Sequence, residues 1–256
     1  MAKKKRNEPQ TCAYCGQVTT DSTKDEPVPK CLFAPPRDSL ISVPACKKCN
    51  NELKSRDDSY LRDMLALERE VSAHPDGMFI YETFLRASQK DMSVIARIVR
   101  KHGEFTYERD PETGLYLPVI SVPLSRDRVR GVFKWIAQGL YYHDHGTVLD
   151  PTYRYLFKRI SQSEAEAKEH FIASCGWKPN WTVGSRGQFR YFHIWFEDPN
   201  VTFWQMVFYE RIFFVASSVP PNVNSLEEFD SRMAGLRDSD STSSTASPPD
   251  ASSSSN

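Results

Sequence analysis

Four cysteines form the clearest chemical pattern in this chain. Cys12 and Cys15 make one CxxC pair, and Cys46 and Cys49 make a second. Each pair places two sulfurs on a tight turn, and two such turns can complete a tetrahedron of thiolates around one Zn²⁺. A single CxxC arises easily by chance, whereas two pairs in one short segment are a strong signal. The spacing therefore predicts that these four residues bind a structural zinc ion.

Two other interpretations of the cysteines stay open at the level of sequence. The residues could be buried thiols or form disulfides, or one pair could be a transient redox site. A redox CxxC normally follows a hydrophobic strand inside a βαβ unit, and neither pair has that setting. Six cysteines, four of them in such pairs, fit a reducing compartment better than a secreted framework. We therefore expect a cytoplasmic protein.

The residues around the cysteines predict the elements that position them. The segment SLISV (39–43) mixes β-branched and small residues and is typical of a short strand. Apolar residues at helical spacing predict a helix from Lys47 to about Arg69, with a break near 55–59 where Asp and Ser can cap a second helix. Together these elements predict a zinc-bound ββα module over residues 10–73.

Three stretches of this segment, CAYCG, KDEPVPK and SLISVPACKKCNNELK, resemble the four-cysteine branch of the HNH (His-Asn-His) endonuclease family. That branch has a CxxCG turn, an acidic residue and a histidine before a proline, an Asn-Leu strand, and a CxxCN turn that leads into a helix. The similarity covers about residues 10–65. It implies metal-dependent hydrolysis of phosphodiester bonds in nucleic acid, with a structural Zn²⁺.

The resemblance also assigns the catalytic positions, and several of them are substituted. The family's acidic position falls on Asp25, its histidine on Glu26 and its middle asparagine on Ser39, while Asn50 keeps a family-typical residue after the last cysteine. In the family the histidine deprotonates the attacking water, and its neighbours hold a divalent ion. The resemblance therefore implies Glu26, Asp25 and Asn50 as catalytic candidates.

A glutamate in the position of the base changes the expected chemistry. A carboxylate with an ordinary pKa of about 4.3 is a weaker base at neutral pH than imidazole. General-base catalysis is worth about 10²–10⁴-fold, so part of that factor is lost. Asp25 and Glu26 could instead both bind a catalytic Mg²⁺ or Mn²⁺, or be two solvated loop acids. The resemblance thus implies a metal-dependent HNH-type endonuclease, with full or weakened activity, or alternatively a catalytically inactive zinc module that binds nucleic acid or a protein.

Charge gives limited support to a nucleic-acid partner. Lys plus Arg and Asp plus Glu both number 33 in the 256 residues, so the net charge is zero. Residues 1–56, however, carry eleven Lys/Arg against six Asp/Glu, which suits a surface that faces phosphates and favours DNA. Residues 1–9 form a basic arm without the apolar stretch of a secretory signal. The sequence contains no apolar run long enough to predict a membrane-spanning helix.

The remaining chain is predicted to form a second, α+β domain. The turn-rich HPDGM (74–78) marks the boundary, residues 79–225 form the domain, and the Ser-rich residues 226–256 form a disordered tail. The segments expected within the domain are helices at 79–102, 125–141, 153–160 and 163–173, a hairpin at 105–109 and 115–122, and strands within 182–217. Aromatic residues on both faces of those strands predict an antiparallel sheet that is covered on both sides.

Two weaker patterns also occur in this second domain. Arg126, Arg130 and Lys134 follow one helix face at four-residue spacing and could contact a phosphate backbone, although an exposed charged face is the commoner case. His143 and His145 are two residues apart, which is weak evidence for a metal site. His193 lies in a strand-like run and is expected to be a packed strand residue.

Overall fold

The protein has a mixed α+β fold, seen in a computed structural model that describes most of the chain. The described residues are 8–37, 40–90, 104–109, 113–121, 125–184 and 187–232. Ser39, the basic arm up to residue 7, residues 91–103 and residues 233–256 lie outside them, so the predictions made for those positions stay predictions. Within the described parts, no helix combines the length and the apolar character needed to cross a membrane.

The N-terminal part combines short antiparallel strand pairs with a long helical segment. Its elements are β1 (Gln10–Thr11), β2 (Val18–Thr19), β3 (Ser22–Asp25), η1 (Lys30–Leu32), β4 (Val43–Cys46), η2 (Lys48–Lys54), α1 (Ser55–Ala66), α2 (Arg69–Ser72) and α3 (Pro75–Lys90). β1 pairs with β2 and β3 with β4, both antiparallel. A strand was predicted at 39–43, but the observed strand β4 begins only at Val43 and pairs with β3 from there to Cys46.

The helical segment after β4 changes its hydrogen-bonding pattern where a break was predicted. η2 is a π-helix that ends at Lys54, and α1 continues directly from Ser55 as an α-helix. Short π segments inside helices often mark functional sites. The Asp and Ser residues at 55–59 therefore lie in the first turns of α1 and do not separate two helices.

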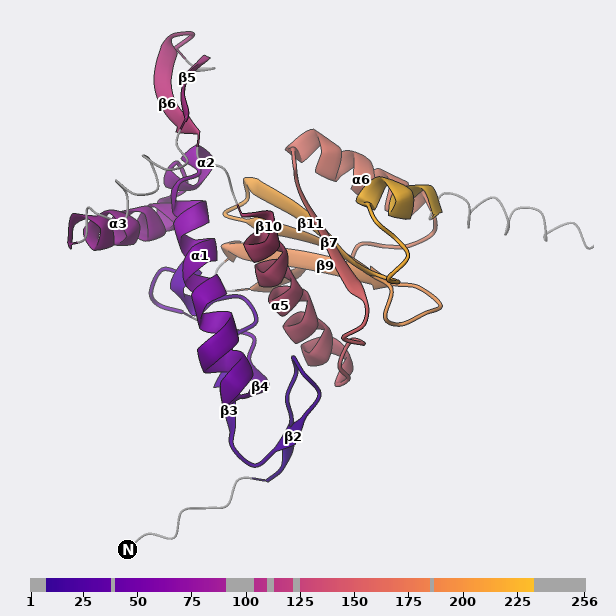
Figure 1. Cartoon of the computed structure of the whole chain (residues 1–256). Helices are drawn as coiled ribbons and strands as arrows, with labels where there is room; N and C mark the ends of the chain where they lie inside the picture. Colours follow the sequence, from indigo (N-terminus) through magenta and orange to yellow (C-terminus); the bar gives the residue numbers. More distant parts are fainter. Residues whose placement is uncertain are drawn as a thin grey trace, which may run out of the picture.

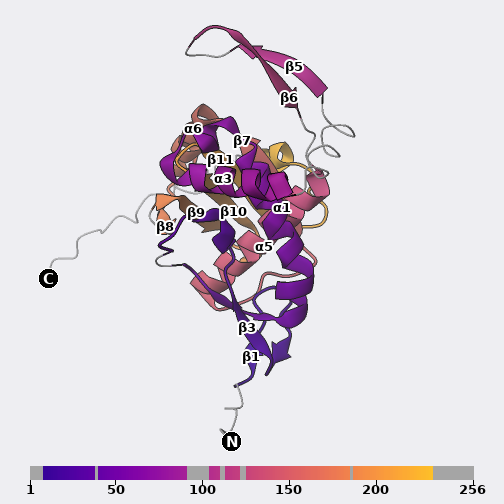
Figure 2. The same ribbon diagram turned by 90° about the vertical axis from the view of Figure 1, so that its left-hand side faces the viewer.

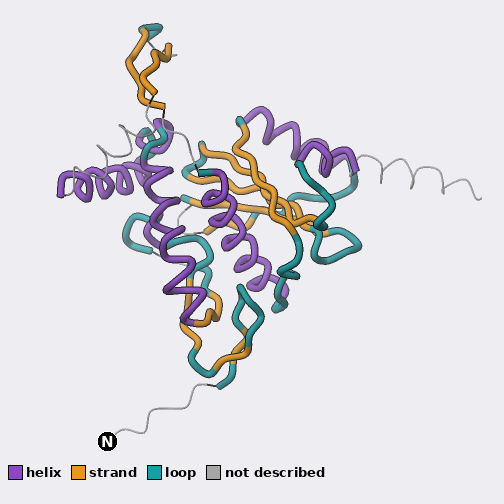
Figure 3. Tube along the Cα trace, viewed as in Figure 1, coloured by secondary structure: helices purple, strands orange, loops and turns teal. Residues whose placement is uncertain are grey.

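The C-terminal part is built on one five-stranded antiparallel sheet (Figures 1 and 3). Its elements are β5 (Glu104–Arg109), β6 (Tyr116–Ser121), α5 (Arg126–His145), β7 (Arg154–Ile160), α6 (Gln162–Ser174), β8 (Thr182–Gly184), β9 (Phe189–Trp195), β10 (Thr202–Phe208) and β11 (Ile212–Val219). The strand order is β7-β11-β10-β9-β8. The separate β5–β6 hairpin projects away from this body (Figure 2).

Both faces of the sheet are buried, as the aromatic pattern predicted. One face packs Phe214 and Trp204 against residues of α5 such as Phe133. The opposite face packs Val215 in a second cluster with Ile172 of α6. β10 and β11 are buried at every position, so the sheet is the centre of the molecule.

The helix predicted at 153–160 is wrong, because this segment forms strand β7. Its apolar residues fit a helical stripe, but a period read over so few residues cannot separate a helix from a strand. β7 pairs along its whole length with the buried strand β11, from Arg154 opposite Val219 to Ile160 opposite Phe213. Pairing with a buried strand satisfies the backbone groups on one edge of β7 and fixes it as a strand.

The predicted start of the disordered tail at residue 226 is also wrong. Residues 226–232 are helical, and Leu226 and Phe229 are buried against the α6 side of the sheet. Ser225 accepts a hydrogen bond from the Glu228 backbone N–H at 3.1 Å, in the Ser-x-x-Glu arrangement that starts helices. Two apolar side chains at helical spacing are enough to attach this segment to the core.

The N-terminal part and the sheet share one hydrophobic core. Val28 and Leu61 belong to the same cluster of buried side chains as Phe133 and Trp204. α1 lies beside α5, as Figure 1 shows. Residues on both sides of the boundary predicted at 74–78 therefore contribute to one core, and the division into domains stays a prediction.

Candidate metal centre

The four cysteines lie together with the geometry of a tetrathiolate site. Their sulfur atoms are all within 4.8 Å of one another, and the Sγ atoms of Cys15 and Cys46 are 3.9 Å apart. Four sulfurs at about 2.3 Å from a central Zn²⁺ would lie about 3.8 Å from each other in a regular tetrahedron. No disulfide joins any of the six cysteines in this structure. The cluster could therefore hold a metal ion such as zinc.

The two CxxC turns come from different parts of the N-terminal fold. The first lies between β1 and β2, where Gly16 adopts a left-handed φ of 73° and donates a backbone hydrogen bond to the Cys12 carbonyl at 2.9 Å. The second joins the end of β4 to η2, and the Cys49 N–H points at the Cys46 sulfur at 3.5 Å. Backbone N–H groups directed at sulfur stabilise the thiolate form that zinc requires.

Helix α5 packs against the segment that carries the first cysteine turn. Tyr14, between the first two cysteines, meets Trp135 edge-to-face with 5.3 Å between ring centroids. Trp135 in turn donates a hydrogen bond from Nε1 to Asp57 at 2.9 Å. At Gly139 a Cβ atom would lie 2.6 Å from the Pro27 ring, so only glycine permits this close approach. The cysteine turns thus pack against α5, the helix that also covers one face of the sheet.

The predicted catalytic residues lie beside the cysteine cluster but have different surroundings. Asp25 is only 4% exposed and accepts a hydrogen bond from the Tyr14 hydroxyl. Asn50 donates from Nδ2 to Thr23 Oγ1 at 2.9 Å, which ties η2 to β3. The Glu26 side chain is half-buried and has no bonded partner among the described residues. Of the three candidates, only Glu26 has an available carboxylate.

Lys54 is a buried cation that the sequence did not single out. It is 1% exposed, and its Nζ lies 2.8 Å from the Glu26 carbonyl oxygen, 2.9 Å from both carboxylate oxygens of Asp58 and 3.5 Å from Asp25. Burial raises the pKa of Asp58 to about 6, although Lys54 opposes that shift. The i, i+4 spacing of Lys54 and Asp58 was the available signal. Their contact with Asp25 depends on the tertiary fold.

A second polar cluster lies at the C-terminal end of α5. His145 is paired with His193 of β9 and not with His143, and the two Nε2 atoms are 3.0 Å apart. His193 is stacked on Trp204 with 4.3 Å between ring centroids, and burial lowers its pKa to about 4. His193 is therefore a packed strand residue, as expected, but its ring edge reaches another histidine. The sequence could not reveal this pair because its members are 48 residues apart.

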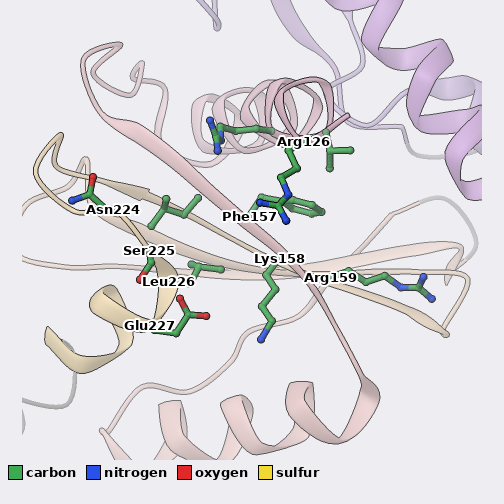
Figure 4. Close-up of a pocket in the computed structure, with 11 residues that line it drawn as sticks. Arg126, Phe157, Lys158, Arg159, Asn224, Ser225, Leu226 and Glu227 are labelled. Atoms are coloured by element: carbon green, nitrogen blue, oxygen red, sulfur yellow. The ribbon is translucent and has the colours of Figure 1, made fainter. Parts of the chain in front are cut away.

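The basic row of α5 lines a groove of about 520 Å³ beside β7 (Figure 4). Arg126 and Arg130 contribute to it, whereas Lys134 lies over the Tyr155 ring, 5.6 Å from its centroid. Three cations in the groove are ion-paired: Arg130 with Asp127, Lys158 with Glu164, and Arg159 with Glu68. These acids neutralise much of the positive charge, so the groove is not a strong anion site.

Comparison of the chain with protein-family models, with curated proteins and with solved structures gave no match. The resemblance to HNH endonucleases therefore rests on the motif residues alone. Independently of that resemblance, the molecule is an α+β protein with a cluster of four cysteines that could bind a metal ion.

Proposed function

We propose that residues 10–66 are an HNH-like zinc module that binds nucleic acid and has lost its hydrolytic centre. The order of elements supports the proposed relationship to HNH modules, because the β3–β4 hairpin leads through a CxxC turn into the η2–α1 helix. The four clustered cysteines supply the structural zinc site of that branch. The chain keeps the scaffold that such a module needs, while two of its three candidate catalytic groups bond within the protein.

The position of Lys54 carries the argument against hydrolysis. A catalytic divalent ion would need the Asp25 carboxylate, which already lies 3.5 Å from the Lys54 ammonium and bonds to Tyr14. A divalent ion would have to displace Lys54 from Asp25, because the ammonium alone repels an ion about 4 Å away by about 8 kcal/mol at an effective dielectric constant of about 20. Asp58, which also pairs with Lys54, offsets part of this repulsion. Within the described residues, the cysteine cluster is the only group of three or more His, Cys, Asp or Glu side chains suited to a metal.

Exposed charge supports a nucleic-acid partner. Among the described residues of 8–56, the exposed cations outnumber the exposed acids Glu8, Asp21 and Glu52. These cations are Lys24, Lys30, Arg37, Lys47, Lys48 and Arg56. Lysine and arginine bind the phosphate backbone without regard to sequence, which gives affinity that falls with salt. DNA is the partner that we test first.

A second candidate function is metal-dependent cleavage of nucleic acid, and Glu26 favours it. Its half-buried carboxylate follows Asp25 directly and has no bonded partner in the described part of the chain. It could bind Mg²⁺ or Mn²⁺, or act as a base with less effect than the family's histidine. In this alternative Asp25 would have to leave Lys54 to reach the ion.

Two measurements on the zinc-loaded full chain separate these functions. The first is binding of a labelled DNA duplex, single-stranded DNA and RNA across a salt series. The second is nicking of a plasmid with Mg²⁺, Mn²⁺ or Ni²⁺, with and without EDTA. We expect salt-dependent binding and no nicking. Nicking that stops with EDTA and is lost in Glu26→Gln would support the nuclease, and the absence of both binding and nicking would favour a protein partner.

Charge variants test the binding surface. In Lys24→Ala and Lys48→Ala, each phosphate contact that is lost should reduce the slope of log affinity against log salt by about 0.9 for duplex DNA. Arg232→Ala is the matched control, because Arg232 lies in the C-terminal helix and pairs with Glu228 at 2.7 Å. An equal loss of affinity in the control would mean that binding follows overall charge and not this module.

A further inference from the structure

Two histidines face one cavity at the end of α5. His145, in the last turn of that helix, and His193, in β9, have their Nε2 atoms 3.0 Å apart. Both line a cavity of about 540 Å³, whose other polar walls are Asp144, Lys178, Asn180 and Thr182. The cysteine cluster uses neither histidine, so this pair is a separate feature of the molecule.

The spacing of the two nitrogens suits a shared metal ion. Imidazole nitrogens bind Zn²⁺ at about 2.0–2.1 Å. Two such nitrogens lie about 2.9 Å apart when the angle at the metal is a right angle, and about 3.3 Å apart when it is tetrahedral. The observed 3.0 Å lies within this interval. The ring centroids lie 5.3 Å apart, so the two nitrogens face each other nearly head-on, and both rings must tilt to direct their lone pairs at a shared ion.

A neighbouring carboxylate favours the tautomer of His193 that a metal requires. Asp144 Oδ2 lies 3.5 Å from His193 Nδ1, which is not the nitrogen that faces His145. The Tyr191 hydroxyl donates a hydrogen bond to the same carboxylate oxygen at 3.3 Å. An acid beside Nδ1 favours a proton there and leaves the Nε2 lone pair for a metal, as in many zinc sites.

Aromatic contacts hold both rings in place. His193 is stacked on Trp204, and His145 lies edge-to-face against Trp195 with 4.8 Å between centroids. Tyr141, one helical turn before His145, lies 4.4 Å from the same imidazole. Rings confined in this way have little rotational freedom to lose when an ion binds, and these aromatic contacts must adjust to the tilt that binding requires.

We propose that His145 and His193 bind a divalent late first-row metal ion such as Ni²⁺, Co²⁺ or Zn²⁺ through their Nε2 atoms. Without metal, one Nε2–H donates to the other nitrogen. On binding, that proton leaves Nε2 and the same ring is protonated at Nδ1, so the charge of the two imidazoles does not change. The remaining coordination positions open into the cavity, where water completes the shell. With two protein ligands, the site is weaker than the tetrathiolate and exchanges its ion readily.

The test is a metal titration of full-length protein that already holds one zinc on its cysteines. Calorimetry with Ni²⁺ or Zn²⁺ should show that the wild type binds one further metal ion per chain, which is its second equivalent. His145→Gln and His193→Gln should each lose that equivalent and keep the first zinc. His143→Gln, on an exposed neighbour of the same helix end, is the matched control and should bind like the wild type.

Two further readouts exclude a purely structural explanation. Asp144→Asn should weaken the second equivalent about 10–100-fold without abolishing it, as other losses of such outer partners do. Bound Ni²⁺ should quench the fluorescence of Trp195 and Trp204, and the quenching should reverse with EDTA. A wild type that takes up only one ion, or a second ion that persists in both histidine variants, overturns the proposal and leaves a hydrogen-bonded pair. Neither outcome affects the nucleic-acid proposal, which rests on other residues.

Discussion

The cysteine-bearing N-terminal region and the five-stranded sheet become ordered by different means. The first has strands of two to four residues and a small cluster of buried side chains around Cys12, Tyr14 and Val43. The sheet has strands of seven and eight residues at its centre and is packed on both faces by aromatic and aliphatic side chains. Short segments that bury little apolar surface need another source of stability, and a metal ion can supply it.

The comparison indicates where each region is vulnerable. In the strand pairs that carry the cysteines, order should depend on a few polar and metal-binding groups whose removal has large effects, whereas Leu32 and Leu61 of the same N-terminal part belong to the core shared with the sheet. In the sheet, order should depend on many apolar contacts, each of moderate value.

Loss of zinc should have the largest effect. Protein purified without added zinc should contain about one zinc per chain, and Cys49→Ser should lose it. Structural zinc contributes about 10–16 kcal/mol of apparent folding free energy in small metal-dependent domains. Metal analysis and limited proteolysis should therefore show a zinc-free variant that is cleaved first within residues 10–54. Cys175→Ser is the control, and a wild type without zinc would contradict the metal centre.

Phe214→Ala tests the core of the sheet. This ring packs against Phe133 with 4.7 Å between centroids and is buried in β11. Removing a buried phenylalanine side chain costs about 3–5 kcal/mol, because it loses apolar burial and leaves a cavity. Denaturant unfolding should show this loss while zinc stays bound. Tyr107→Ala, at a side chain that is 69% exposed, should change the unfolding free energy by less than about 0.5 kcal/mol.

Lys54→Met tests the buried polar network of the N-terminal region. Removing one partner of a buried ion pair typically costs about 3–5 kcal/mol, because the remaining charges lose their compensation. Asp58 adds a pH dependence, since its pKa is raised from 3.8 to about 6 on folding. A carboxyl with a raised pKa destabilises the fold as it ionises, so this penalty grows as the pH rises from 3.8 through 6.

The Lys54→Met variant should therefore lose stability more steeply with rising pH than the wild type, as measured by thermal unfolding on both sides of pH 6. Adding Asp58→Asn to it should recover part of the loss, because the uncompensated carboxylate is then neutral. A single variant as stable as the wild type at every pH would contradict the role given to Lys54.

Gly139→Ala tests the junction between the two regions and should have a smaller effect. The added Cβ would lie 2.6 Å from Pro27, so α5 and the N-terminal region must separate slightly. Overpacking of this kind costs about 1–3 kcal/mol. At Gly131 the same substitution meets only the end of Asp57 at 3.3 Å, and the better helix propensity of alanine offsets the contact. Equal unfolding free energies for the two variants would contradict a tight junction at Gly139.

The sequence predicted features that local spacing controls and missed those that depend on distant partners. The cysteine pairs, helix α5 and the aromatic strands were visible because their patterns repeat within a few residues. β7 was predicted as a helix because its short apolar pattern fits a helical spacing. Its structure is instead decided by pairing with β11, which the local sequence does not reveal. Lys54 and the pair of His145 and His193 were missed because the groups that surround them come from separate elements.

The placement of α5 has a thermodynamic consequence. Tyr142 of this helix packs against the cysteine cluster, and His145 lies three residues further on. With a rise of about 1.5 Å per residue, the two positions are about 5 Å apart along the helix axis. If zinc on the cysteines reduces the motion of this end of α5, it increases the affinity of the histidine pair for its metal ion by some factor. By reciprocity, an ion on the histidines must then improve the affinity of the cysteines for zinc by the same factor.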